Sequence, residues 1–309
     1  MSQRWNATLS GKRDILAVRA RMVHSIRNYF ISRDYLEVET PNRIPALIPE
    51  PYIDAVTSGE WFLHTSPEVC MKRLVAADYR RIFQICKCYR EGERGSRHLA
   101  EFTLLEWYCE GVDYCSLMDQ CEEMIITVAR DLGYGDVVHY QGNTISLPGA
   151  WGRISVADAL ARYARISIEE AIHGECFDEV MVCSVEPHLG IDRPTFVYDY
   201  PVSSGVLAKV KDMDPLTAER FELYMGGMEI ANGFSELVDM GEHHRRFREV
   251  MEYRRSTGKK VLPEPTHFLN DLVTMPDSAG VALGVDRLTM IFTNSPVIDD
   301  VVTFTPEMV

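Results

Sequence analysis

The sequence lacks the usual marks of a membrane, secreted or metal-stapled protein. No apolar run approaches the roughly 18 residues needed to cross a bilayer, and the first residues, MSQRWNATLSGKRD, have no apolar core like that of a signal peptide. The eight cysteines form no paired CxxC units, although a single residue separates Cys86 from Cys88. We therefore expect a soluble cytoplasmic protein with reduced thiols, and the spacing indicates neither a zinc site nor a disulfide framework.

Positive charge is also scarce. The chain has 32 Lys and Arg against 46 Asp and Glu, a net charge of −14. Nonspecific nucleic-acid binding depends on cationic side chains that neutralise phosphates. This charge balance therefore disfavours a protein that binds nucleic acids nonspecifically. With 309 residues, 46% of them hydrophobic, the chain can build one large catalytic domain or two small ones.

The stretch FQICKCYREGERGSRHLAEFTLLEWY, residues 83–108, predicts two strands joined by a polar loop. Since side chains alternate along a strand, Glu106 shares an otherwise apolar and aromatic face with Phe102 and Tyr108. A lone glutamate in a strand is more often solvated at a sheet edge. Here the loop also carries a group of cations that suits a bound polyanion, namely Arg90, Arg94, Arg97 and His98.

Four segments together resemble one enzyme family. Arg90, His98 and EFTLLEWY (residues 101–108) resemble motif 2 of the class II aminoacyl-tRNA synthetases, in particular the lysyl branch. The predicted amphipathic helix of residues 14–33, followed by YLEVETP, resembles motif 1. GVALGVDRLTMIF (residues 280–292) resembles motif 3, and RFELYMGGMEIANGFSEL (residues 220–237) is similar to the metal and substrate strand of the lysyl enzymes. The four occur in the family's order, which is a stronger signal than any one motif.

The resemblance implies an α+β fold, with an antiparallel sheet flanked by helices. We expect a single catalytic domain over residues 1–309, with a helical insertion at about residues 139–190, and a homodimer built through motif 1. Lysyl-tRNA synthetases carry an anticodon-binding β-barrel ahead of this domain, but motif 1 begins almost at the start of this sequence. We therefore expect no anticodon-binding domain and do not expect tRNA to be a partner.

The implied reaction is attack of an amino acid carboxylate on the α-phosphorus of ATP, which gives an aminoacyl-adenylate and pyrophosphate. The resemblance assigns catalytic roles to Arg90, between the substrate carboxylate and the α-phosphate, and to Arg287. It assigns His98, with Arg287, to the outer phosphates and Phe102 to the adenine ring. The acidic residue with which the family contacts adenine is missing from its usual place in motif 2, and Glu93 is its predicted replacement.

A hairpin at residues 226–227 gives a geometric reason for a metal site. A two-residue glycine turn pairs Tyr224 with Glu229 and Glu222 with Ala231, so that Glu222 and Glu229 lie diagonally on one face. Two such carboxylates repel each other unless a cation lies between them, although both could be solvated. They resemble the synthetases' carboxylate pair for Mg²⁺ on ATP.

Specificity for a lysine-like amino acid is implied by Glu106, Tyr108 and Glu236 as partners of a terminal amine. Glu68 falls in the first turn of a predicted helix, where the helix dipole alone explains a carboxylate, but the resemblance adds a role in binding the substrate's α-amino group. The predicted amino-acid-binding residues are Ser66, Glu68, Arg90, Glu106, Tyr108, Asn232, Phe234, Glu236 and Ala282.

Strand parity makes a further prediction. Asn232, Phe234 and Glu236 share one strand face but do not share it with Glu229 by simple alternation. If all of them line one site, a bulge must lie between them, and residues 232–233, Asn-Gly, are the natural place.

Two positions favour one subgroup, the elongation factor P–lysine ligases, over the tRNA enzymes. Ser66 stands where the tRNA enzymes usually have alanine, and Ala282 where they usually have glycine. The subgroup activates lysine, preferably (R)-β-lysine, and transfers it to a lysine side chain of elongation factor P. The added methyl group of Ala282 could displace an α-amino group and favour the β-isomer, by about 1–3 kcal/mol.

The motif 2 loop departs from the family pattern at Gly92, Leu99 and Ala100, which points to a diverged subgroup. One alternative is a truncated lysyl-tRNA synthetase-like enzyme that makes lysyl-adenylate for tRNA or another acceptor. Another is an inactive synthetase-like dimer that senses lysine or binds a partner. The second is disfavoured because the chain keeps the residues that such proteins usually lose: Arg90, Arg287, Glu222 and Glu229.

Overall fold

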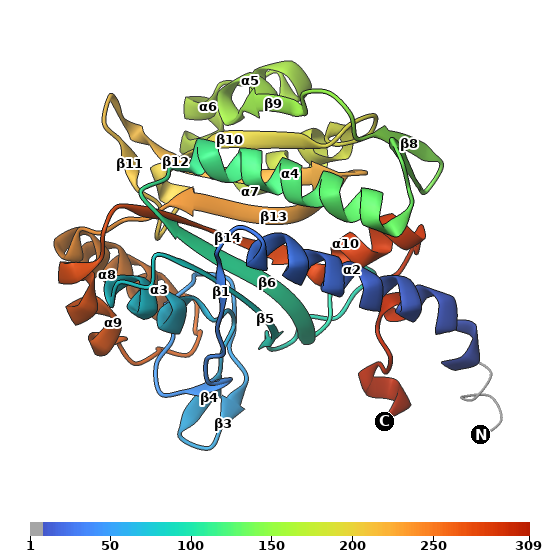
Figure 1. Cartoon of the computed structure of the whole chain (residues 1–309). Coiled ribbons are helices and arrows are strands. Elements are labelled where there is room, and N and C mark those ends of the chain that lie inside the picture. Colours follow the sequence, from blue (N-terminus) through green and yellow to red (C-terminus); the bar gives the residue numbers. More distant parts are fainter. Residues whose placement is uncertain (1–8) are drawn as a thin grey trace.

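The computed structural model describes residues 9–309, and at its centre is a nine-stranded sheet (Figure 1). Strands β2, β3, β4, β7 and β8 lie outside this sheet, in two smaller ones. In chain order, all the strands are β1 (Leu36–Glu37), β2 (Arg43–Ile44), β3 (Thr57–Ser58), β4 (Trp61–Leu63), β5 (Arg81–Tyr89), β6 (Glu101–Glu110), β7 (Val137–Tyr140), β8 (Asn143–Ser146), β9 (Gly152–Ser155), β10 (Thr195–Pro201), β11 (Val210–Lys211), β12 (Asp214–Met225), β13 (Met228–Ser235) and β14 (Ser278–Gly284).

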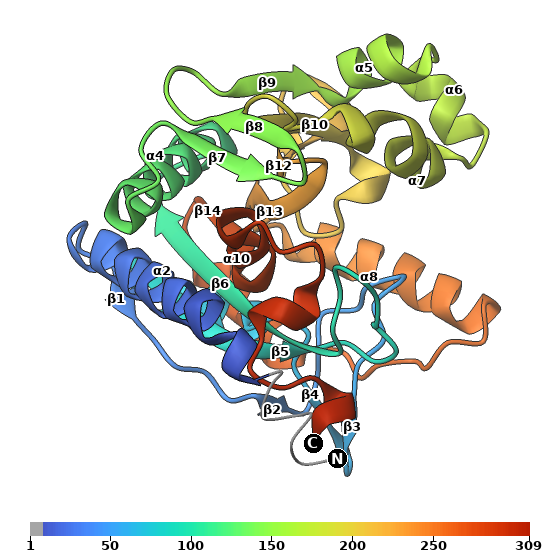
Figure 2. The same ribbon diagram turned by 90° about the vertical axis from the view of Figure 1, so that its right-hand side faces the viewer.

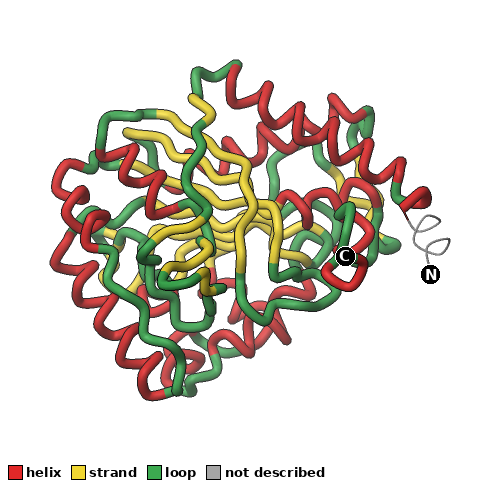
Figure 3. Tube along the Cα trace, turned by 90° about the horizontal axis from the view of Figure 1, so that it is seen from below, coloured by secondary structure: helices red, strands yellow, loops and turns green. Residues whose placement is uncertain are grey.

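The helices surround these strands, as the view in Figure 3 shows. They are α2 (Arg13–Ile31), α3 (Glu68–Ala76), α4 (Tyr114–Leu132), α5 (Val156–Ala159), α6 (Ile168–His173), α7 (Phe177–Val180), α8 (Met240–Ser256), α9 (Thr266–Asp271) and α10 (Val285–Thr293). Short 3₁₀ segments span Glu186–His188, Val202–Ser204, Leu272–Thr274, Ile298–Val301 and Pro306–Met308, and two π-helical turns span Leu160–Ala164 and Met181–Val185.

The main sheet has the order β1-β5-β6-β14-β13-β12-β10-β9, with β11 paired to β12. Its middle strands are antiparallel, as expected, but β1 runs parallel to β5 and β9 runs parallel to β10. The sheet is therefore mixed at its two edges. Because β14 lies between β6 and β13, the three segments that resemble motif 2, the metal and substrate strand, and motif 3 become neighbours in space.

The predicted hairpin of residues 83–108 is the pair β5–β6, in register from Arg81 opposite Cys109 to Tyr89 opposite Glu101. The predicted alternation is confirmed. Leu105 and Trp107 are fully buried in the core that also contains residues of α2 and α4, whereas Tyr108 belongs to the cluster on the other side of the sheet. Glu106, on the face of Tyr108, is thus directed away from the main core.

Helices α2 and α4 pack side by side over one face of the sheet (Figure 1). In α2, Phe30 stacks on Phe83 of β5 with ring centroids 4.9 Å apart. Helix α4 has clear boundary signals: the Asp113 side chain accepts a hydrogen bond from the Ser116 amide, and Gly133 ends the helix with φ 85°. The other face is covered only in part, by α3, α8 and α9, whose apolar residues pack with Tyr108.

The segment 139–190 is not wholly helical, so this prediction is wrong for its first part. It begins with the end of the hairpin β7–β8 and with β9, which extends the main sheet beside β10 (Figure 2). The helices start only at Val156 and pack around their own apolar cluster. Here β9 gains its hydrogen bonds from a strand that follows the insertion, a long-range pairing that local periodicity does not reveal.

The hairpin β12–β13 turns at Gly226 and Gly227, both with positive φ as a type I′ turn requires. Tyr224 pairs with Glu229 as predicted, but Glu222 pairs with Asn232 and not with Ala231. The cause is a bulge in which Ile230 is the extra residue, so the change of parity occurs there and not at residues 232–233. The predicted bulge therefore exists between Glu229 and Asn232, and its predicted position is wrong.

Across residues 9–309, no helix combines the length and the apolar character that a membrane span requires.

Candidate active site

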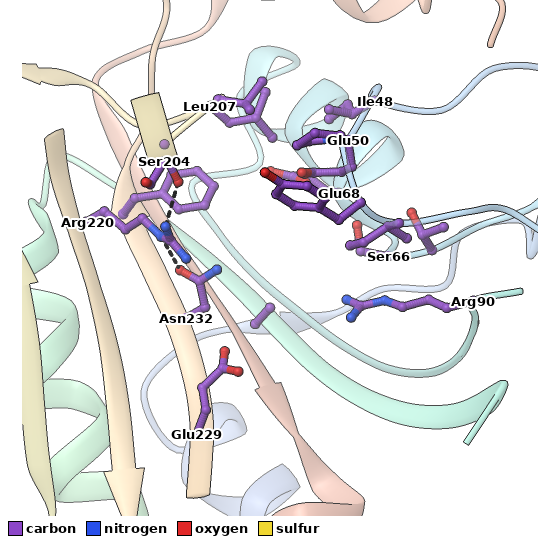
Figure 4. Close-up of a pocket in the computed structure, with 18 of the residues that line it drawn as sticks. Ile48, Glu50, Ser66, Glu68, Arg90, Ser204, Leu207, Arg220, Glu229 and Asn232 are labelled. Carbon is purple, nitrogen blue, oxygen red and sulfur yellow. Dashed lines mark hydrogen bonds between the residues drawn. The ribbon is translucent and has the colours of Figure 1, made fainter. Parts of the chain in front are cut away.

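A cleft of approximately 1280 Å³ opens on the sheet face opposite α2 and α4 (Figure 4). Figure 4 shows Arg220, Asn232 and Glu229 along one wall, with Arg90 and Glu68 across the cavity. The cleft gathers most of the predicted site residues: Ser66, Glu68, Arg90, Glu93, His98, Phe102, Glu106, Tyr108, Glu229, Asn232, Phe234, Ala282 and Arg287. Glu222 and Glu236 are not among the lining residues and lie behind this surface.

Strand register aligns the floor of the cleft in rows. One row runs across five strands as Gln84, Glu106, Ala282, Asn232 and Glu222. Ala282 therefore stands directly between Glu106 and Asn232, with its methyl group on the same face.

The next row contains Tyr108, Gly280, Phe234 and Arg220. A Cβ atom at Gly280 would collide with the Tyr108 ring and would approach Glu236 Oε1 to 2.9 Å, so this position requires glycine. The absence of a side chain there leaves room for Tyr108 and Glu236 to lie over the strand.

One end of the cleft, which we call the amine end, is a buried carboxylate cluster. Glu106 is 2% exposed and accepts a hydrogen bond from the Tyr108 hydroxyl at 2.5 Å. Burial, reinforced by the charge of Glu68, raises the pKa of Glu106 well above its ordinary value. A neighbouring cation would lower this pKa again and stabilise the ionised carboxylate.

Lys72, which sequence reasoning missed, is the cation already present at the amine end. Its Nζ lies 2.6 Å from Glu68 Oε1 and 2.6 Å from Glu236 Oε2, and it also stands 4.9 Å from the centre of the Phe234 ring. The available signal was its position one helical turn after Glu68 in SPEVCMKRL. The ion pair with Lys72 holds the Glu236 carboxylate beneath the cleft surface, which explains why Glu236 does not line the cleft.

Charge is not balanced at this end. Lys72 pairs with Glu68 and Glu236, whereas the nearby Glu106 has only the hydrogen bond from Tyr108, so three carboxyl groups face one ammonium group. Burial raises the pKa of Glu236 to about 8, although Lys72 opposes the shift. A second ammonium group would relieve this imbalance, so the amine end suits a ligand that carries one.

Glu50 is a second residue that the sequence did not reveal. It lines the cleft above Glu68 in Figure 4. Burial and the charge of Glu68 raise its pKa to about 7. It lies in the irregular segment between β2 and β3, where no periodicity marks a residue as inward-facing.

Arg220 organises the wall formed by β12 and β13. Its Nε donates to Asn232 Oδ1 at 3.1 Å, its Nη1 donates to the Ser204 carbonyl at 2.6 Å, and its Nη2 donates to Glu222 Oε1 at 2.5 Å. The first two bonds are the dashed lines in Figure 4. The guanidinium group thereby orients the Asn232 amide and anchors the 3₁₀ segment Val202–Ser204, which directly follows β10.

The loop of residues 202–208 borders the cleft and is held by Arg246 of α8. Arg246 is 4% exposed, and its Nη1 donates to the carbonyls of Gly205 at 2.6 Å and Ala208 at 3.0 Å. A buried guanidinium group that binds backbone carbonyls fixes the loop path.

The opposite end of the cleft, which we call the phosphate end, carries the cations. The Arg90 guanidinium carbon lies 4.9 Å from the centre of the Phe102 ring, and Nη1 lies 3.7 Å from Glu93. The predicted contacts Arg90, Phe102 and Glu93 are thus neighbours. An aromatic face and a guanidinium group together offer a surface for a purine and its phosphates.

Arg287 reaches the phosphate end from the first turn of α10, despite the unfavourable helix dipole. Its Nη1 donates to the carbonyl of Glu229 at 3.0 Å and contacts Glu229 Oε2 at 3.2 Å, while Nη2 lies 2.6 Å from His98 Nε2. These partners hold the arginine where it is. Burial and the charge of Arg287 lower the pKa of His98, which keeps the imidazole neutral.

The helix that carries Arg287 begins at Val285, directly after β14. Asp286 is buried, accepts a hydrogen bond from the Thr103 amide at 2.7 Å and pairs with Arg19 at 2.6 Å. This contact ties α10, β6 and α2 together beneath the cleft.

The carboxylate pair predicted to hold Mg²⁺ is divided between the cleft wall and its interior. Glu229 lines the cleft, whereas the half-buried Glu222 is engaged by Arg220 and by the hydroxyls of Tyr200 and Tyr224 at 2.7 and 2.6 Å. Burial raises the pKa of Glu186, and the charges of Glu222 and Glu229 raise it further. A hard divalent cation would relieve this repulsion, although the oxygen atoms of the three carboxyl groups do not all lie within 4.8 Å of one another in the described residues.

The departures in the motif 2 loop have local structural roles. Gly92 has φ 77°, a conformation that favours glycine, and Leu99 is buried in the main core. The Ala100 carbonyl accepts a hydrogen bond from the Arg90 amide at 2.9 Å and so closes the base of the loop.

Comparison with known proteins agrees with this geometry. The family described as tRNA synthetases class II (D, K and N) matches residues 5–308. The chain belongs to this family. The middle strands of its sheet carry the segments that resemble motif 2, motif 3, and the metal and substrate strand. Because these strands are neighbours, their residues line one cleft.

Several curated relatives cover nearly the whole chain. An elongation factor P–(R)-β-lysine ligase of Pseudoalteromonas translucida is 37% identical over 307 residues, with 94% of each chain covered. A protein of the same name from an Enterobacter species is 35% identical over 306 residues, again with 94% of each chain covered. A lysine–tRNA ligase of Moorella thermoacetica is 34% identical over 319 residues, with 94% of this chain and 65% of that protein covered.

Proposed function

We propose that this chain is an ATP-dependent, AMP-forming aminoacyl ligase that activates lysine or (R)-β-lysine and transfers it to a lysine side chain of elongation factor P. One observation carries the proposal: the row of Glu106, Ala282 and Asn232 lies beside the buried cluster of Glu68, Lys72 and Glu236. An excess of buried carboxyl groups in a cleft is what an ammonium-bearing amino acid needs.

In the first step the substrate carboxylate attacks the α-phosphorus of ATP. The new bond is P–O, pyrophosphate leaves, and the aminoacyl-adenylate remains. Arg90 would bridge the carboxylate and the α-phosphate, His98 and Arg287 would bind the outer phosphates, and Phe102 would stack on adenine. Such a reaction needs positioning and charge neutralisation, and no protein nucleophile.

The same residues divide the recognition of the amino acid. Glu106, Glu236 and Tyr108 would receive the terminal amine, while Glu68 and Ser66 would receive the other amino group. Asn232 and Phe234 would line the intervening methylene chain, and Ala282 would set which carbon carries the amine. The hydrogen bond from Arg220 to Asn232 supports this arrangement because it fixes the amide beside Ala282.

Glu222 and Glu229 would hold Mg²⁺ against ATP, with Glu186 nearby. The fit is supported by the mutual repulsion of the three carboxyl groups and by the exposure of Glu229 in the cleft. A bound Mg²⁺ supplies neutralisation of the charge on the phosphates. Arg287, which contacts Glu229 here, would then be free to turn toward the outer phosphates.

In the second step the amine of a protein lysine attacks the carbonyl carbon of the adenylate, an isopeptide bond forms and AMP leaves. The names of the relatives that span 94% of both chains support elongation factor P as the acceptor. Because this acceptor is a translation factor, we expect the reaction to take place in the cytoplasm. The Moorella relative supports a second candidate, transfer of lysine to tRNA.

We also propose a homodimer formed through α2 and β1. Its support is two exposed aliphatic side chains, Ile31 at the end of α2 and Leu36 in β1, each more than half exposed. Burial of such side chains against a second copy would be favourable.

The test is amino-acid-dependent exchange of pyrophosphate into ATP by the purified protein, with α-lysine, (R)-β-lysine and ornithine compared. Exchange with a lysine-like substrate supports the adenylate site. Failure of exchange with every amine-bearing substrate contradicts it. Added elongation factor P and tRNA, assayed by mass shift and by charging, then separate the two candidate acceptors.

A further inference from the structure

A cluster of soft metal ligands lies beside the cleft, among residues that do not line it. It consists of His64, which follows β4, and of Cys86 and Cys88 on β5. Their ligand atoms all lie within 4.8 Å of one another, and within residues 9–309 no other group of three or more His, Cys, Asp or Glu residues meets this condition. His64 and Cys88 are buried, and Cys86 is half-buried, so the cluster has one accessible side.

The distances within the cluster fit a tetrahedral thiolate site. The two sulfur atoms are 3.9 Å apart. Two thiolates bound to zinc, with Zn–S near 2.3 Å, stand about 3.8 Å apart at the tetrahedral angle. The separation is far from the roughly 2.05 Å of a disulfide. Cys86 and Cys88 therefore have the spacing of two ligands of one ion without being bonded to each other.

The histidine is oriented as a metal ligand. His64 Nε2 lies 2.7 Å from the carbonyl oxygen of Lys87, and a carbonyl can only accept, so Nε2 carries the proton. The lone pair is consequently on Nδ1. Metal-binding histidines typically donate their other ring N–H to a carbonyl or carboxylate, and this bond fixes both the tautomer and the plane of the ring.

A fourth group completes the polar surroundings. Gln84 shares the face of Cys86 and Cys88 on β5, is 3% exposed, and its Oε1 atom finds no hydrogen-bond partner among the described residues. A buried amide oxygen without a partner costs free energy, about 1–3 kcal/mol. An ion, or a water bound to it, would satisfy this oxygen.

We propose that His64, Cys86 and Cys88 form a binding site for a thiophilic divalent cation of the zinc class, with the fourth position open to water or to Gln84. The cysteine spacing alone does not predict it because the histidine comes from another strand. The ion would link the end of β4 to β5, two residues before Arg90, and would restrain the strand from which Arg90 enters the cleft.

The experiment uses the full chain, reduced and stripped of metal with a chelator. Zn²⁺ is added, unbound metal is removed by gel filtration, and bound metal is measured. Co²⁺ serves as a second probe, because thiolate ligation gives it an intense charge-transfer absorption. We expect about one ion per chain, the thiolate-to-cobalt band, and a rise of several degrees in unfolding temperature with Zn²⁺.

The decisive variant is Cys86→Ser, which removes one ligand at a half-buried position, with Cys183→Ser as the matched control at an exposed cysteine. We expect Cys86→Ser to lose the cobalt band and the Zn²⁺-dependent rise in unfolding temperature, while Cys183→Ser keeps both. Circular dichroism without metal checks that both variants fold.

Two results would overturn the proposal. One is retention of the metal and of the thermal shift by Cys86→Ser, which would locate the ion elsewhere. The other is the absence of stoichiometric metal in the wild-type chain, whether or not Cys86 and Cys88 oxidise to a disulfide in air. Neither result bears on the aminoacyl ligase proposal, because the readouts are metal content and stability.

Discussion

The two ends of the cleft are built on different physical principles. At the amine end the charged groups are buried in the sheet: Glu106 and Glu236 are each 2% exposed, and Lys72 is 1% exposed. At the phosphate end the side chains of Arg90 and Arg287 are 28% and 22% exposed. The charged groups of the amine end are thus held in place by the fold, while those of the phosphate end are partly exposed to solvent.

This difference predicts where selectivity and rate arise. A buried carboxyl group without a partner strongly disfavours a neutral ligand, so the amine end should decide which amino acid binds. In the proposed reaction, the arginines of the phosphate end would meet the charge that develops on the phosphates, so they should decide how fast it proceeds. The following predictions separate the two contributions.

The largest effect is expected at the phosphate end. Arg287→Ala should lower the rate of ATP–pyrophosphate exchange by about 10²–10³-fold, because one charge-stabilising donor is lost. Its effect on the lysine concentration that gives half-maximal exchange should be small. Initial rates at saturating ATP measure this.

Arg80→Ala, at a 70% exposed arginine outside the cleft, is the matched control and should leave the rate unchanged. A variant Arg287→Ala with at least a tenth of the wild-type rate would contradict the assignment.

At the amine end, Glu106→Gln should weaken binding of lysine by about 100-fold, the equivalent of about 3 kcal/mol for a buried charge pair that loses one partner. Glutamine keeps the shape and a hydrogen bond to Tyr108 but cannot carry a negative charge. Norleucine, which lacks the amine, should be affected little, so the preference for lysine shrinks.

Glu101→Gln, at an exposed position on the same strand, should behave as wild type. Equal losses for lysine and norleucine in Glu106→Gln would show that the residue does not recognise the amine.

A smaller effect is expected from the methyl group between Glu106 and Asn232. Ala282→Gly should shift the ratio of exchange rates for α-lysine and (R)-β-lysine toward α-lysine by about 10-fold, within the 1–3 kcal/mol typical of one methyl group. Ala279→Gly, on the core face of the same strand, has a comparable backbone cost and should leave the ratio unchanged. An unaltered ratio in Ala282→Gly would remove this residue from the specificity account.

The smallest effect concerns stability and pH. The pKa of Glu50 rises from its ordinary 4.5 to about 7, so the native state binds a proton that the unfolded state releases between these values. This contribution to the free energy of unfolding is present below pH 4.5 and is lost as pH rises through 7. Glu50→Gln should remove this contribution. The free energy of unfolding of the variant, measured relative to that of the wild type, should therefore be higher at pH 8 than at pH 5, by on the order of 1 kcal/mol.

Urea unfolding at the two pH values measures this change, with Glu252→Gln at an exposed helical position as control. The same pH dependence in wild type and in Glu50→Gln would assign the proton to another group.

The two ends of the cleft also differ in how far the sequence predicts them. Alternation along β6 predicts that Glu106 and Tyr108 leave the core, but their position opposite Ala282 and Gly280 of β14 comes from the assembled sheet. Lys72 and Glu50 escape prediction for different reasons. A lysine in an amphipathic helix is usually solvated, and a glutamate in an irregular segment has no periodicity to place it.

The bulge shows a second limit. Parity requires one irregularity between Glu229 and Asn232, and the sequence offers Asn232 and Gly233 as its natural place. The structure puts it at Ile230, an apolar residue that carries no local signal for a bulge. Packing of Ile230 into the main core decides the position, and this is a property of the assembled sheet.

The insertion shows the same limit in another form. Its helices from Val156 onward have the expected periodicity, but β9 does not become a strand through its own sequence alone. It pairs with β10, whose residues lie some distance along the chain beyond the helices. Local reasoning therefore finds the helices and misses the strand.

The central claim is that this cleft makes a lysyl adenylate and transfers it to elongation factor P. The most direct measurement is the intact mass of elongation factor P after incubation with the chain, ATP, Mg²⁺ and either (R)-β-lysine or α-lysine, with tRNA charging measured in parallel. The account predicts one added aminoacyl group on the factor, dependent on ATP and formed far more slowly with Arg287→Ala, and no charged tRNA. An unmodified factor together with charged tRNA would contradict it.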